Sequence, residues 1–161
     1  MVFMTFQYTN AISELKTLLS TNWNLINTDN IKPNIDYIYN KKRIDSFWNG
    51  DWVLLQRIGT SETQSSFGNT GRNREYRIYI DVRSDYIEES STNDSETGIS
   101  HLSKIEGEIS RIIDTNVSYS FLAGCGIIEF EQGFSDNSDG LKGLYRSKAI
   151  VKITKWSEAV S

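Results

Sequence analysis

The stretch REYRIYIDVRS, residues 74–84, decides the fold, because its side chains alternate between two kinds. In an extended chain, one face carries Tyr76, Ile78, Ile80 and Val82, and the other carries Arg77, Tyr79, Asp81 and Arg83. Such alternation is typical of a strand that has one face against an apolar core. The pattern therefore predicts a β-strand whose apolar face needs a cover.

Two amphipathic helices are expected to supply this cover. The stretch ISHLSKIEGEISRII, residues 99–113, has apolar residues at helical spacing, and Ser100 is its candidate N-cap. A second helix is predicted over residues 10–21, with Thr9 or Asn10 as its N-cap. The apolar stripes of the two helices are Ile12, Leu15, Leu18, Leu19, Ile99, Leu102, Ile105, Ile109, Ile112 and Ile113.

Further strands are predicted along the rest of the chain. A short strand follows the only proline, Pro33, and is expected near a sheet edge. The others have apolar or alternating patterns bounded by turn residues. The predicted strands cover residues 35–39, 52–58, 117–122, 127–132 and 145–156, with a break at the AGCG stretch of residues 123–126.

Two polar segments separate these elements. The stretch GTSETQSSFGNTGRN, residues 59–73, is too long for a tight hairpin turn, so we expect a long loop over residues 60–73. The stretch SDYIEESSTNDSETG, residues 84–98, is acidic and rich in Ser and Thr, and we expect a flexible acidic loop there. Long ordered loops are often functional or interfacial.

The last two strands are predicted to pair across the turn-rich stretch GFSDNSDGLKG, residues 133–143. Folding back about its midpoint places acidic residues of one strand opposite basic residues of the other, and each such pair contributes about 0.2–1 kcal/mol. The predicted pairs are Glu129 with Lys148, Glu131 with Arg146, Ile128 with Ala149 and Ile127 with Ile150. The core face is expected to hold Ile128, Phe130, Ala149, Val151 and Ile153.

These elements predict an α+β fold, with a mostly antiparallel sheet of about four to six strands and two amphipathic helices on one face. The 161 residues are the size of one ordinary domain, and we expect residues 1–161 to form a single domain. A chain of this length buries a sizeable core without needing a disulfide or a metal ion.

Charge and composition narrow the function classes. The net charge is -4, whereas a domain that binds a nucleic-acid duplex usually carries a basic excess. The start MVFMTFQYTN lacks the features of a secretory signal, and no apolar run is long enough to cross a membrane. A single cysteine, Cys125, excludes an intrachain disulfide and is consistent with a cytoplasmic origin.

No motif predicts a catalytic, cofactor or metal site. Catalysis by a Cys–His pair needs Cys125 and His101 to meet, and nothing in the sequence brings them together. Neither CxxC nor HxxxH spacing occurs, and the glycines form no phosphate-binding loop. A solvated loop is the preferred interpretation of the acidic run, with cation binding as the alternative; its residues are Glu88, Glu89, Asp94 and Glu96. We therefore expect that the protein is not an enzyme and that it binds no cofactor.

Two groups of basic residues are predicted to form distinct regions of the protein surface. Arg146, Lys148, Lys152 and Lys155 lie on or beside one strand, and we interpret them as a salt-paired sheet surface. Arginine is enriched at protein interfaces and forms forked pairs with carboxylates. The candidate subunit interface therefore joins the region of the 60–73 loop to the acidic loop of a neighbouring copy. An equally weighted alternative is that the arginines lie at a solvent-exposed hairpin base and bind no partner. Its residues are Phe67, Arg72, Arg74, Arg77, Glu88 and Glu89.

The order of elements resembles the tail terminator proteins of long-tailed bacteriophages and related archaeal viruses. The segments that carry this resemblance are NAISELKTLLS, DWVLLQRIG, REYRIYIDVRS, ISHLSKIEGEISRII, GIIEFEQG and LYRSKAIVKITKW, which together span most of the chain. The likeness lies in pattern and length, and other neck and tail-completion proteins share a similar layout. The acidic insertion before the second helix departs from the compact pattern, so no particular interface residue is carried over.

The resemblance implies a structural virion protein of the tail or neck, assembled in the host cytoplasm. It implies that copies form a ring, expected to be a hexamer, which caps the tail tube and joins it to the head. The implied partners are further copies, the tail tube and the neck or connector proteins. The alternatives are another connector component, a monomeric protein- or ligand-binding module, and an enzyme whose site the sequence does not reveal.

Overall fold

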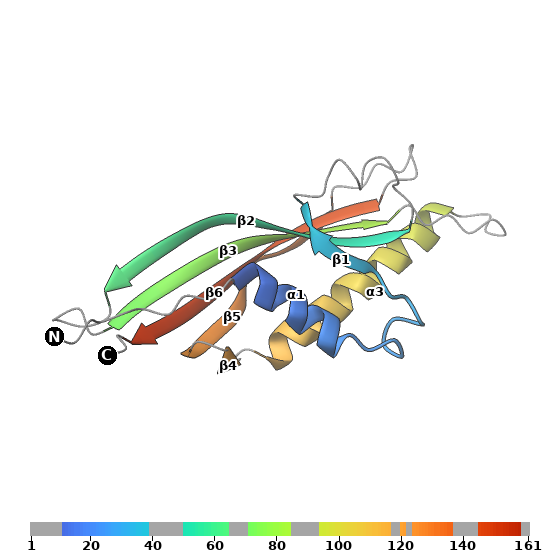
Figure 1. Ribbon diagram of the computed structural model, residues 1–161. Helices are drawn as coiled ribbons and strands as arrows, with labels where there is room; N and C mark the ends of the chain where they lie inside the picture. Colours follow the sequence, from blue (N-terminus) through green and yellow to red (C-terminus); the bar gives the residue numbers. More distant parts are fainter. Residues whose placement is uncertain are drawn as a thin grey trace, which may run out of the picture.

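The computed structural model describes residues 11–38, 50–64, 71–84, 94–116, 120–121, 124–136 and 145–158. Within these residues, two helices cover one face of a six-stranded sheet with the strand order β1-β2-β3-β6-β5-β4 (Figure 1). The helices are α1 (Ala11–Asn22) and α3 (Asp94–Thr115). The strands are β1 (Asn34–Tyr37), β2 (Asp51–Gln64), β3 (Gly71–Ser84), β4 (Ser120–Phe121), β5 (Gly124–Asp136) and β6 (Tyr145–Glu158).

The fold class predicted from the sequence is confirmed. β1 pairs in parallel with β2, and all other pairings between the described strands are antiparallel. β1 occupies one edge of the sheet, as expected for the short strand after Pro33. β4 lies at the opposite edge and contains only Ser120 and Phe121 of the strand predicted over residues 117–122.

The core lies between the helices and the inner part of β2, β3 and β6. The alternation in β3 has the predicted consequence, because Ile78, Ile80 and Val82 are fully buried. Leu55 of β2 and Val151 of β6 are also fully buried within the same cluster. Fully burying one such side chain contributes about 1.5–3 kcal/mol, so this stripe is a main source of stability.

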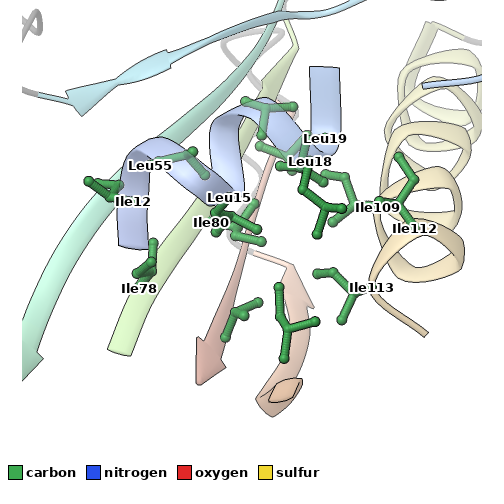
Figure 2. Packing of buried hydrophobic residues seen from close by; sticks show 14 of the residues in the cluster. Ile12, Leu15, Leu18, Leu19, Leu55, Ile78, Ile80, Ile109, Ile112 and Ile113 are labelled. Carbon is green, nitrogen blue, oxygen red and sulfur yellow. The ribbon is translucent and has the colours of Figure 1, made fainter. Parts of the chain in front are cut away.

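The two helices bury the apolar stripes that their spacing predicted. α1 contributes Leu15, Leu18 and Leu19, and α3 contributes residues including Ile109 and Ile113. Figure 2 shows Ile109 and Ile113 projecting from α3 toward the same interior as Leu15 of α1. α1 begins and ends within one residue of the prediction, while its expected N-caps, Thr9 and Asn10, lie outside the described residues.

The beginning of α3 differs from the prediction. The helix starts at Asp94, so Ser100 lies inside it and is not its N-cap. Only Ser84, in β3, and residues 94–98, in α3, belong to the described part of the predicted acidic loop 84–98, and these are not loop. Asp94 and Glu96 fall in the first helical turn, where the helix dipole favours negative charge. Acidic composition therefore marks a helix start here.

The long loop predicted over residues 60–73 is also wrong. β2 continues to Gln64 and β3 begins at Gly71, and the ladder between them runs on to the pair Gln64–Arg72. The polar composition misled the prediction, because strand pairing depends on backbone hydrogen bonds and not on apolar side chains. The outer parts of these strands have polar side chains because they extend past the helices.

The register predicted for β5 and β6 is wrong by four residues, although the faces are right. Glu129 lies opposite Lys152 instead of Lys148, and Ile128 lies opposite Ile153 instead of Ala149. β5 extends to Asp136 and has irregularities between Phe130 and Gln132 and between Gln132 and Ser135. An even shift keeps each side chain on its face, so Ile128, Ala149, Val151 and Ile153 are still buried.

A buried ion pair fastens α1 to the sheet beyond the apolar cluster. Lys155 Nζ contacts a carboxylate oxygen of Glu14, and the two side chains are only 6% and 12% exposed, respectively. Burial lowers the pKa of Lys155, against the opposing effect of the Glu14 carboxylate. Such a pair need not stabilise the fold relative to apolar residues, but breaking it leaves one charge buried alone.

We predict that Lys155→Met lowers the free energy of unfolding by about 3–5 kcal/mol, because it leaves the Glu14 carboxylate without its counter-ion. The double variant Glu14→Leu, Lys155→Met should regain most of this loss, since both buried charges are then absent. Urea unfolding measures both effects. Lys104→Met is the control, because the ion pair of Lys104 with Asp29 is exposed and is expected to contribute less than about 1 kcal/mol. Wild-type stability of the Lys155→Met protein would contradict this account.

Candidate functional site

The outer parts of β2, β3 and β6 form an extension, here called the arm, and residues 126–129 of β5 pair with β6 along its inner part. The arm comprises residues 59–64 of β2, 71–77 of β3 and 152–158 of β6. In Figure 1 these strands continue well past the beginning of α1. The β2 side of the arm is polar, and Thr60 and Ser61 are exposed. The β2 side of the arm is therefore outside the helix-covered core, whereas Tyr76, Ile153 and Lys155 within the arm are buried.

Among the strands that the structure describes, each side of the sheet has an edge with no further partner strand along part of its length, here called an open edge. β1 pairs with residues 52–55 of β2. No other described strand pairs with the outer side of residues 56–64. At the other side, β4 pairs with β5 only at Gly124 and Cys125, which leaves residues 126–136 without a described outer neighbour. An open edge presents backbone N–H and C=O groups that a further strand is able to bind.

The structure gives Arg77, one of the predicted interface residues, a partner in its own chain. Its Nε donates to both carboxylate oxygens of Glu131 at 3.0 Å, and a terminal nitrogen lies 3.6 Å from Glu75. Arg72 and Arg74 belong to β3 within the arm, opposite Ser157 and Lys155 of β6. Phe67, Glu88 and Glu89 lie outside the described residues. The interface role of all six stays a prediction.

The basic residues of β6 are engaged, but with partners other than those predicted. Lys152 pairs with Glu129 at 3.3 Å, and Arg146 lies 3.4 Å from Asp81, not beside Glu131. The ammonium of Lys148 lies 4.9 Å from the ring centre of Tyr79, a cation–π contact. These contacts follow from the register, because Lys148 lies between Asp81 of β3 and Ser135 of β5, and Arg146 lies opposite Arg83 of β3, so neither basic residue faces Glu129 or Glu131.

A Ser–Asp–His cluster joins the start of β2, the end of β3 and α3. The Asp51 carboxylate accepts a hydrogen bond of 2.6 Å from Ser84 Oγ and lies 2.7 Å from His101 Nε2. Nucleophilic catalysis needs the serine hydroxyl on the imidazole, whereas here the aspartate stands between the two. Ser84 is also fully buried. The cluster therefore fastens three elements together and lacks the geometry of a serine hydrolase.

The fold keeps His101 and Cys125 apart. His101 contacts Asp51, which lies in the row of the sheet that contains Ser84 and Tyr145. Cys125 precedes Gly126, whose row contains Lys155. The ten residues from Tyr145 to Lys155 along β6 span about 33 Å at ~3.3 Å per residue. A Cys–His pair between these residues is therefore excluded.

The part of the chain that the structure describes contains neither a metal-binding cluster nor a helix able to span a membrane. There, no three His, Cys, Asp or Glu side chains gather as a metal site. Of the acidic run singled out in the sequence, Glu88 and Glu89 lie outside that part. None of the helices described has the length and apolar character required to span a bilayer.

A buried carboxylate on α3 holds the turn that follows α1. Glu108 is 2% exposed and accepts hydrogen bonds from the backbone N–H of Asn24, the Asn27 side chain and the Arg111 guanidinium. Burial opposes ionisation of Glu108, but these hydrogen bonds prevail and hold its pKa below the usual range. The turn so held exposes 85% of Ile26. Sequence reasoning missed this cluster, because nothing local links residue 108 to residues 24–27.

Comparisons with known proteins return no relative: no protein-family model matches the chain, and no curated protein is significantly similar to it. The arm, the open edges and the internal pairing of the charged groups are therefore the features that bear on function.

We predict that Glu108→Gln lowers the free energy of unfolding at neutral pH by about 1–3 kcal/mol, because buried donors lose a charged acceptor. Since the folded-state pKa of Glu108 is lowered, its contribution is complete above the unfolded-state pKa and is lost as the pH falls through the folded-state value. The difference between variant and wild type should therefore shrink in acid. Urea unfolding at a series of pH values measures it.

Glu106→Gln is the matched control, because burial raises the pKa of Glu106 despite a smaller opposing effect of Ser147. Ionisation of Glu106 costs stability as the pH rises above the unfolded-state pKa, so this variant should be stabilised at neutral pH and unchanged in acid. If both variants change the free energy of unfolding in the same direction and with the same pH dependence, the opposite pKa shifts assigned to Glu108 and Glu106 are wrong.

Proposed function

We propose that this protein is a structural component of a tailed virion whose copies form a closed ring at the head-proximal end of the tail. In this role it acts as a tail terminator or as another neck component and joins the tail to the head. Its partners are further copies of itself, the tail tube and the connector proteins. The resemblance in the order of elements supports the class, and the projecting arm with open edges supports self-association.

The arm is the observation that carries this proposal. Three strands of 14 residues each are longer than the apolar core requires, since α1 and α3 cover only their inner part. Strand backbone at an open edge gains hydrogen bonds when a neighbour pairs with it. A contact between two different surfaces of identical subunits closes into a ring when the rotation between subunits is a whole fraction of a turn.

The polar clusters support a role based on surfaces. Asp51, Glu108 and Glu14 each bind groups from other elements of the same chain. Their contacts position helices and turns, as expected for a subunit that must keep a rigid shape within an assembly. A net charge of -4 further favours protein partners over the nucleic-acid backbone.

We predict that replacing residues 61–75 by Asn-Gly abolishes the ring and leaves a folded monomer. Thr60 and Tyr76 are opposite each other in the ladder, so a two-residue turn closes the shortened hairpin, and the buried residues from Tyr76 onward are kept. Native mass spectrometry and negative-stain imaging report the assembly, and circular dichroism with urea unfolding reports the fold.

Ile26→Ser is the control for this experiment, because Ile26 is exposed on the turn after α1 and lies outside the arm. That variant should assemble like the wild type. A shortened protein that still forms the full ring would remove the arm from the mechanism. A wild-type protein that stays monomeric at every concentration would refute the proposal and favour a binding module, while turnover that depends on His101 would favour an enzyme.

A further inference from the structure

The two open edges contain regular, bulge-free segments on the same rows of the sheet. β2 is irregular between Arg57 and Gly59, but its pairing runs without a break from Gly59 onward. The pairing of β5 with β6 is equally regular from Gly126 to Phe130. Four rows cross the whole arm and end on both edges: Gly59–Arg77–Lys152–Glu129, Thr60–Tyr76–Ile153–Ile128, Ser61–Glu75–Thr154–Ile127 and Glu62–Arg74–Lys155–Gly126.

The directions of the edge strands suit each other. β2 is antiparallel to β3, β3 to β6, and β6 to β5, so β2 and β5 run in opposite directions within one subunit. A neighbouring copy that continues the sheet keeps the same strand directions, and its β5 therefore meets β2 in antiparallel fashion. Antiparallel pairing is slightly more stable per residue than parallel pairing.

Charge favours this unlike pairing over pairing of β5 with itself. β5 carries Glu129, Glu131 and Asp136 and no basic residue; Lys152 and Arg77 pair with the first two from within the chain, but two β5 strands side by side still bring carboxylates together with no basic residue of either edge between them. Residues 56–64 of β2 carry one basic residue, the exposed Arg57, and one acidic residue, Glu62. An acidic edge therefore fits beside β2 with less repulsion than beside another copy of itself.

Side chains on the shared rows also match in kind. Thr60 lies on the core face, in the row of the buried Tyr76, Ile153 and Ile128. When the sheet continues into a second copy, that copy's Ile128 extends the same row, and its Ile127 lies beside Ser61 on the outer face. The pairing therefore leaves the faces of both sheets aligned.

We propose that the outer edge of β2, from Gly59 to Glu62, binds the outer edge of β5, from Gly126 to Glu129, in a second copy of this chain. The contact is antiparallel and joins the sheets of successive subunits into one continuous surface. This inference rests on the proposed ring and specifies the two strands that close it. In this contact the arm binds the neighbouring copy through backbone hydrogen bonds, and its side chains contribute less to the binding.

Cysteine cross-linking between differently labelled copies tests the pairing. One protein carries Ser61→Cys and another carries Ile127→Cys, both with Cys125→Ser so that no native thiol remains. Both new cysteines are on the outer face, and opposed strand residues are close enough for a disulfide. Gly59→Cys mixed with Ile127→Cys, and Ser61→Cys mixed with Glu129→Cys, form a second set, which allows for a shift of two residues in register. We expect oxidation of mixtures to give a disulfide-linked heterodimer, identified by mass spectrometry.

The outcomes separate this inference from the ring itself. Either protein oxidised alone, and Ile26→Cys mixed with Ile127→Cys, should give no comparable product. A Ser61→Cys protein that links only to itself would show a symmetric β2–β2 contact and overturn the inference. A ring of normal mass that yields no heterodimer with either set would overturn it while leaving the proposed function intact, whereas the absence of any ring would overturn both.

Discussion

Burial of the helix-facing side of the sheet is the constraint on which the rest of the structure depends, although Leu54, Asp81 and Arg83 on the other side are buried as well. α1 and α3 cover the inner part of one face, where Ile78, Ile80 and Val82 of β3 are removed from water. The strands continue beyond that cover, and there they are stabilised by the ladder between neighbours more than by apolar contacts. The limited extent of the core and the polar end of the arm therefore share one cause, which is that the helices are shorter than the strands they cover.

Charged groups determine where the helices sit on this sheet. Glu14 on α1 contacts Lys155 at the arm, Glu108 on α3 binds the turn after α1, and His101 on α3 binds Asp51 at the opposite end. Burying charges is costly, and each of these contacts joins elements that are distant in sequence. Together they allow one placement of the helices where apolar packing alone would tolerate small shifts. The cluster at Asp51 resembles catalytic chemistry in composition only, because its geometry serves attachment.

An arm of this kind suits a protein that acts through its surfaces. Backbone groups at a strand edge bind another strand with little dependence on side-chain identity, which agrees with the polar, unremarkable sequence of residues 59–64. Interfaces built in this way leave few traces in a single sequence. Side-chain composition therefore indicates the arginines near residue 74 rather than a strand edge, although Arg77 is held by Glu131 within its own chain.

The sequence by itself determined the class of the fold, the central strand and the buried stripe of each helix, because these depend on periodicities of two and about 3.6 residues within one segment. The tertiary structure alone decided how far β2 and β3 extend, the four-residue shift between β5 and β6, and the partner of each charged group. Ladders between strands form through backbone groups that every residue carries, and ion pairs join positions far apart in the chain. Local sequence patterns indicate neither the strand ladders nor the ion pairs, so only the folded chain shows the arm and its two open edges.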